Sequence, residues 1–201
     1  MNKIISITLA IMMSFTLNAS ENKLEKVYSI VKQRNPLEWY EIQAELWVKE
    51  LEKDNTNADA WLNYYTAKRM EKLLGGSVNQ QHLNDIVVDL TNSIPNTFEH
   101  HYITYWNGNN DANLYNHLEK AFELSPERPE TYDDFITYFE LQRNTEEVKS
   151  FCDRMFASNN ISANIYAWNY NMMMSTEENA ILITNGDNDT YQQWCFNKIK
   201  T

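Results

Sequence analysis

Apolar side chains recur at helical spacing along most of the chain, and this pattern constrains the fold more than any other feature. In residues 38–53, Trp39, Ile42 and Leu46 lie three or four positions apart, as on one face of an α-helix. Three further stripes share the spacing: Leu83, Ile86, Val87 and Leu90; Leu114, Leu118, Ala121 and Phe122; and Val148, Phe151, Cys152, Met155 and Phe156. Short breaker segments separate the stripes, at residues 54–57, 75–77, 94–96, 107–110 and 125–129. The pattern predicts amphipathic helices paired into hairpins.

Glycine and proline are scarce, with 4 of each among 201 residues. Average proteins contain roughly 12% of the two together. A β-sandwich or barrel needs many turns, and turns use both residues. Hydrophobic residues make up 43% of the chain and aromatic residues 13%, which is too much for a disordered acidic chain. The composition therefore predicts an all-α fold of about one domain.

The chain is acidic, with 28 Asp and Glu against 17 Lys and Arg. A protein that binds nucleic acid without sequence preference needs a basic face that displaces phosphate counterions. Docking on anionic lipid needs a polybasic patch. The charge argues against both classes of partner and is typical of a surface kept soluble by net charge.

The first 19 residues predict a secretory signal peptide. Lys3 gives a positive start, an apolar run follows at residues 4–17, and Ala19 offers a small residue for cleavage. The run is about 14 residues long, whereas a membrane-spanning helix needs about 20. We expect cleavage near Ala19, no membrane span in the mature chain, and a secreted or periplasmic location.

Short sequence elements repeat with a period of 31 to 35 residues, which is typical of a helix-turn-helix solenoid. Ile103-Thr104-Tyr105, for example, recurs as Ile136-Thr137-Tyr138. Two junctions, residues 51–65 (LEKDNTNADAWLNYY) and 121–132 (AFELSPERPETY), resemble tetratricopeptide repeats. The resemblance covers roughly residues 36–174. It implies an α-solenoid of helical hairpins over residues 20–175, whose first helices line a concave ligand-binding face.

Aromatic residues are concentrated on the predicted first helices. They suggest a groove that binds an extended peptide or a glycan through ring faces and hydroxyl groups, although packing between helices is an equally available role. The groove candidates are Tyr64, Tyr65, Tyr102, Tyr105, Trp106, Tyr138, Tyr166 and Tyr170. Leu62 and Thr66 occupy the places where some of these repeats clamp a peptide carboxylate, which argues against that mode. The favoured function is an exported scaffold that binds a protein or peptide, without catalysis of its own.

The C-terminal segment, residues 176–201, differs from the repeats. Residues 180–184 predict a buried strand, and Asp187 and Asp189 follow it after Gly186. Carboxylates in this position could bind Ca²⁺ or Mg²⁺, or Asp187 could simply cap a helix over residues 190–200. The segment resembles a stretch of uncharacterised exported and membrane-bound bacterial proteins in which such repeats adjoin an α/β region. The alternative function is therefore a fragment of a divalent-metal-dependent enzyme that acts on glycan or phosphate substrates.

Cysteine and histidine give weaker signals. Cys152 and Cys195 are 43 positions apart, so export permits a disulfide, but two buried free thiols are the expectation. The four histidines are His82, His100, His101 and His117. Adjacent residues of a helix point in different directions, so we expect surface or cap histidines rather than a metal site. The sequence leaves the oligomeric state and the identity of the partner open.

Overall fold

The computed structural model describes residues 23–29, 32–109 and 111–199. The predicted signal peptide lies outside these ranges. The described residues are helical and contain no strand, which confirms the all-α fold class. The α-helices are α1 (Leu37–Lys53), α2 (Ala58–Leu73), α3 (Gln80–Ser93), α4 (Phe98–Asn107), α5 (Tyr115–Leu124), α6 (Tyr132–Leu141), α7 (Thr145–Ser158), α8 (Ala163–Met174) and α9 (Asp187–Ile199). Two short 3-10 helices, η1 (Ala112–Leu114) and η2 (Pro129–Thr131), precede α5 and α6.

Side chains that cap helices explain why the helices begin where they do. Asn57, Asn79 and Asn144 accept a hydrogen bond from a backbone N–H in the first turn of α2, α3 and α7. Thr97 and Ser162 do the same for α4 and α8. Each cap satisfies one of the backbone donors that a helix leaves unpaired at its N-terminus. The polar breakers of the sequence therefore start helices as well as ending them.

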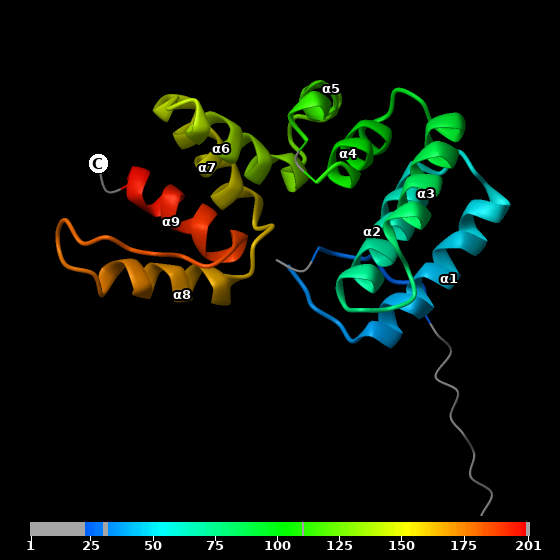
Figure 1. Cartoon of the computed structure of the whole chain (residues 1–201), viewed down its shortest axis with the longest axis horizontal. Helices are drawn as coiled ribbons and strands as arrows, with labels where there is room; N and C mark the ends of the chain where they lie inside the picture. The colour runs from blue at the N-terminus through cyan, green and yellow to red at the C-terminus, as the bar shows by residue number, and fades with distance from the viewer. Residues whose placement is uncertain (1–22, 30–31, 110, 200–201) are drawn as a thin grey trace, which may run out of the picture.

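Neighbouring helices pack together in chain order and form two hydrophobic cores. The N-terminal core joins α1 to α4 and includes Trp47, Tyr65, Leu83 and Ile103. The C-terminal core joins α4 to α7 with α9. Figure 1 shows an arch, with α1 to α3 on one side, α4 and α5 at the crest, and α6 to α9 on the other side. No helix in the described ranges has both the length and the apolar character to cross a membrane.

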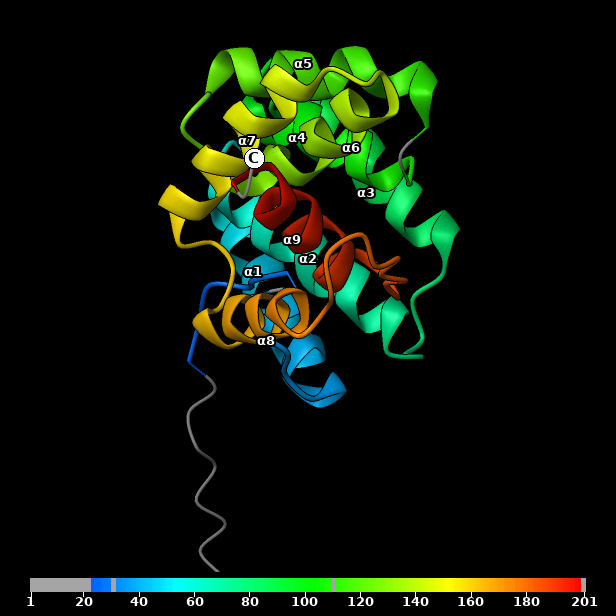
Figure 2. The ribbon, with the colours of Figure 1, turned by 90° about the vertical axis from the view of Figure 1, so that its left-hand side faces the viewer.

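Helix α9 folds back into the arch. It packs against α6, α7 and α8, and both views place it between α8 and the pair α6–α7 (Figure 1, Figure 2). This return brings Cys195 of α9 onto Cys152 of α7, with their Cα atoms 5.2 Å apart and a disulfide between them. The expectation of two free thiols was therefore wrong. Sequence spacing gave no sign of the contact because it depends on the path of α9.

The predicted buried strand at residues 180–184 is not confirmed. In the described ranges these residues pair with no strand, and the side chains of Ile181 and Ile183 are 91% and 89% exposed. A buried strand needs hydrogen-bond partners for its backbone, and the part of the chain that the structure describes offers no partner strand. The following helix also begins earlier than predicted, at Asp187 rather than residue 190.

Candidate functional site

A cleft of about 720 Å³ opens on the inner side of the arch. Its lining comes from residues 26–29 and Lys32 before α1, from α2 and α4 with Asn109, from residues 127–130, 133 and 134 around η2 and the start of α6, from Asn160 between α7 and α8, and from Tyr191 of α9. On α2 the lining residues Leu62, Thr66, Arg69 and Leu73 follow one another at helical spacing. One face of α2 therefore forms the floor of the cleft.

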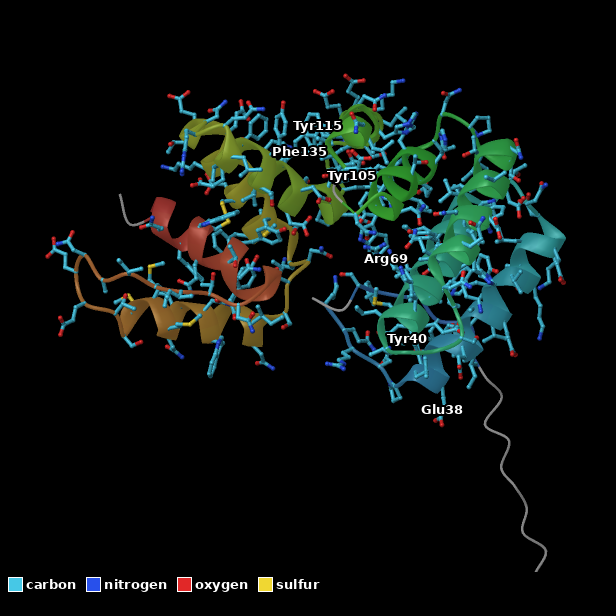
Figure 3. All side chains as sticks on the ribbon, in the orientation of Figure 1. Glu38, Tyr40, Arg69, Tyr105, Tyr115 and Phe135 are labelled. Atoms are coloured by element: carbon cyan, nitrogen blue, oxygen red, sulfur yellow. A yellow bond between two sulfur atoms is a disulfide. The ribbon has the colours of Figure 1, made fainter. Side chains whose placement is uncertain are left out.

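Arg69 and Trp106 connect α2 to α4 within this cleft. The guanidinium carbon of Arg69 lies 4.6 Å from the centroid of the Trp106 ring, a cation–π geometry. Arg69 Nη2 also donates to Asn109 Oδ1 at 3.0 Å, and Figure 3 shows Arg69 on the inner side of the arch. Tyr102, one helical turn earlier on α4, stacks on the Trp106 ring itself, with ring centroids 5.5 Å apart. The result is a continuous aromatic surface with a fixed positive charge beside it.

The opposite wall is acidic. Glu130 of η2 and Asp133 and Asp134 in the first turn of α6 line it. Burial raises the pKa of the Tyr102 and Tyr105 hydroxyls, and the negative charge of Asp133 and Asp134 raises both further. These tyrosines therefore remain protonated donors at neutral pH.

Arg128 balances part of this acidic wall. Its guanidinium pairs with Glu99 and, at 2.8 Å, with Glu130 Oε1, and it lies 3.7 Å from the centroid of the Phe98 ring. The two carboxylates raise the pKa of Arg128 although its burial acts the other way. Arg128 is thus committed to structure, and Asp133 and Asp134 contribute negative charge to the lining of the cleft.

Two of the predicted groove residues, Tyr102 and Trp106, line this cleft. Tyr102 is also buried in the N-terminal core, as is Tyr65, and Tyr105 is buried in the C-terminal core. Neither Tyr65 nor Tyr105 lines the cleft. The Tyr65 hydroxyl donates to Asn107 Oδ1 at 3.1 Å, and burial raises its pKa to about 12. Tyr64 lines a separate hollow of about 520 Å³ between α1, α2 and α3. The predicted set is therefore divided between the cleft, the cores and a second hollow.

The remaining predicted aromatics lie on the C-terminal half. Tyr138 stacks on Tyr115 with ring centroids 3.8 Å apart. Tyr166 packs on Phe156, and Tyr170 is half exposed on α8. Neither hollow is lined by these three tyrosines.

The predicted metal ligands are only partly described. Asp187 begins α9, but its side chain lies outside the described part of the structure. Asp189 sits in the first turn, where its N–H donates to Gly186 O at 3.3 Å. Among the side chains that are described, no three from His, Cys, Asp and Glu come together as a metal-binding set. A Ca²⁺ or Mg²⁺ role for Asp187 and Asp189 stays a prediction.

Three histidines form a cluster that the sequence did not predict. His101 and His117 place their Nδ1 atoms 2.9 Å apart, and the His100 and His101 rings lie 4.6 Å apart. The prediction was surface or cap histidines. His100 and His101 are buried and so do not lie on the surface, whereas His100 Nδ1 accepts from the Asn96 N–H at 3.3 Å, at the start of α4, which agrees with a cap role. Burial, and to a smaller extent the charges of His100, His117 and Lys120, lower the pKa of His101 to about 4. The cluster forms because α5 packs on α4 and brings His117 next to His100 and His101.

Sequence reasoning missed Arg69 and Tyr191 in the cleft. A signal for Arg69 was present, because Leu62, Thr66 and Arg69 share one face of a predicted first helix. Tyr191 had no such signal, since it reaches the cleft only through the return of α9. The disulfide at Cys195, one helical turn later, fixes that return.

No protein-family model matches the sequence, and no curated protein matches it.

Proposed function

We propose that this chain is an exported helical-repeat scaffold that binds an extended segment of a protein or peptide in its central cleft, without catalysis of its own. The observation that carries the proposal is the cleft of about 720 Å³ with the Tyr102–Trp106 surface at its centre. Aromatic faces held between polar walls are common features of peptide-binding sites.

The tetratricopeptide-like arrangement is part of the proposal. In such repeats the first helix of each hairpin faces the concave ligand side. Here α2, α4 and the start of α6, the predicted first helices, all contribute residues to the cleft. That shared orientation supports a repeat scaffold, and the return of α9 then closes the concave side at its C-terminal end.

Charge suggests what the bound segment carries. Asp133 and Asp134 create a negative potential on one wall, and Arg69 lies on the floor. A Lys or Arg side chain of the ligand would face the acidic wall, and an apolar or aromatic side chain would stack on Trp106. Arg69 offers hydrogen-bond donors on the floor, and Asp133 and Asp134 offer acceptors on the wall. Such a site suits a polypeptide better than a purely apolar ligand.

The export part of the proposal has one structural support. The Cys152–Cys195 disulfide is a bond that persists in oxidising compartments and is rare in the cytosol. It agrees with the predicted signal peptide at residues 1–19 and with a secreted or periplasmic location.

Selection from a displayed random-peptide library tests the proposal, followed by fluorescence anisotropy with the selected peptide. Trp106→Leu removes the aromatic face but keeps apolar bulk, and should weaken binding about tenfold or more. Trp168→Leu is the matched control, because Trp168 is 66% exposed on α8 and lies outside the cleft. Circular dichroism confirms that both variants stay helical. Failure to enrich any peptide, or equal losses in the two variants, would contradict the proposal.

A further inference from the structure

Residues 23–28, which we call the N-terminal strap, run extended across α1 and α2. Gln43 of α1 holds the strap with both ends of its amide. Its Oε1 accepts from the Glu25 N–H at 2.9 Å, and its Nε2 donates to the Lys23 carbonyl at 2.8 Å. The strap is blue in Figure 1, where it lies beside α2.

Two more side chains complete this set. Trp47 Nε1 donates to the Glu25 carbonyl at 2.9 Å, and Asn63 Oδ1 accepts from the Val27 N–H at 2.7 Å. All four hydrogen bonds use main-chain atoms of alternate strap residues, at positions 23, 25 and 27. A β-strand presents its N–H and C=O groups to a neighbouring strand with the same alternation. Gln43, Trp47 and Asn63, which we call the main-chain clamp, thus replace a partner strand.

The main-chain clamp is buried and oriented in advance. Gln43 is 2% exposed and Asn63 is 1% exposed. Asn63 Nδ2 donates to the Asp59 carbonyl at 2.7 Å, which leaves its Oδ1 directed at the strap. A buried amide without a hydrogen-bond partner costs about 1–3 kcal/mol. An extended main chain bound against the clamp therefore stabilises it.

Among the side chains of the strap, Val27 is the one that the fold buries. Val27 is buried in the N-terminal core, and Leu24 packs partly against that core. Lys23, Glu25 and Lys26 are exposed. The clamp thus reads the main chain and one small apolar side chain, as in complexes where a peptide adds to a sheet edge.

We propose that the main-chain clamp is a second peptide-binding site, which takes an extended segment of a partner carrying a small apolar residue at the position of Val27. The strap is its resident, displaceable occupant. An incoming peptide can form the same four hydrogen bonds, so the strap holds the site mainly through its tether. A short tether gives an effective concentration in the millimolar range, which a ligand must exceed. Lys26, Val27 and Tyr28 also form one wall of the central cleft, so displacement of the strap widens it.

The test uses the full chain from residue 20 onward and a labelled synthetic peptide of residues 21–30 (ENKLEKVYSI). Val27→Asp expels the strap by placing a charge in the core, and leaves the clamp intact. Fluorescence anisotropy should show the peptide binding this variant about tenfold or more tightly than the wild type. Adding Asn63→Leu to Val27→Asp should abolish binding, and so should Asp at the Val27 position of the peptide. Equal binding by the single and double variants, or no binding by a helical Val27→Asp chain, would overturn the proposal.

If Val27→Asp does not fold, a second measurement, on the wild-type chain, tests the proposal. Amide hydrogen exchange reports the free energy of local opening. The amides of Glu25 and Val27 should exchange through an opening of lower free energy than that of Ile103 in the core. Exchange of both only through global unfolding would mean that the strap is a permanent part of the fold. Trp106→Leu should leave binding at the clamp unchanged, so the clamp and the central cleft succeed or fail separately.

Discussion

The guanidinium of Arg69 lies over the indole of Trp106, with its carbon 4.6 Å from the ring centroid. This pair joins α2 and α4 at the floor of the central cleft. It holds the plane of Trp106 in place while its own charge faces the ligand space. Structure and proposed recognition therefore depend on the same contact.

A double-mutant cycle with Arg69→Met and Trp106→Leu should reveal a coupling of about 0.5–1 kcal/mol in the free energy of unfolding. Arg69→Met keeps the apolar stem and removes the charge, so the coupling isolates the cation–π contact. Urea unfolding measures it. Strictly additive effects of the two changes would mean that the pair does not stabilise the α2–α4 contact.

Loss of the Cys152–Cys195 disulfide should lower the free energy of unfolding by about 2–4 kcal/mol. The bond closes a loop of 43 residues and so restricts the unfolded chain. Urea unfolding of the Cys152→Ser/Cys195→Ser variant measures the loss. Loss of the bond should also increase the rate of amide hydrogen exchange more in α9 than in α1 to α3.

Reductant provides the control for this prediction. It should destabilise the wild type to the level of the double serine variant and leave that variant unchanged. An unchanged midpoint for reduced wild type would show that the packing of α9, and not the bond, holds the helix in place.

Stability should fall as the pH decreases from the ordinary histidine pKa of 6.5 toward about 4. The folded state lowers the pKa of His101, and of His100 and His117 as well, chiefly by burial. The unfolded chain then binds more protons than the folded one, so acid favours unfolding. Protonation of both rings would also remove the acceptor from the His101–His117 hydrogen bond.

Thermal unfolding between pH 7 and pH 5 checks this dependence. His117→Asn should make the slope of Tm against pH shallower, because one depressed pKa is lost and His101 loses a charged neighbour. His82→Gln, an exposed histidine on α3, should leave the slope unchanged. Equal slopes for wild type and His117→Asn would contradict the assignment to this cluster.

Replacement of Ile181 and Ile183 by Ser should change the free energy of unfolding by less than about 0.5 kcal/mol, because both side chains already face solvent. Ile136→Ala, in the C-terminal core, should cost about 2–5 kcal/mol. Chemical denaturation compares them. If the Ser variant lost as much free energy of unfolding as Ile136→Ala, the prediction of a buried strand at residues 180–184 would be correct after all.

The helices could be predicted because their information is local. The apolar stripe at residues 38–53 became α1, and that at residues 148–156 lies within α7. The breaker residues Asn57 and Asn144 act as caps, which is a property of adjacent residues alone. Spacing within a few turns is enough to specify such elements.

The candidate sites were less predictable because they join distant residues. Val27 meets Asn63 across 36 positions, and Cys152 meets Cys195 across 43. The strap has no periodic pattern, since α1 and α2 recognise its main chain. The aromatic residues were identified as a class, but composition cannot separate Tyr102, which lines the cleft, from Tyr65, which packs in the core.

Hydrogen exchange of the full chain, with and without a library-selected peptide, tests the central claim most directly. Bound peptide should bring new protection in α2 around Arg69 and in α4 around Trp106, the floor of the central cleft. Protection confined to the hollow between α1, α2 and α3, around Tyr64 and Asp85, or no change in either place, would contradict it.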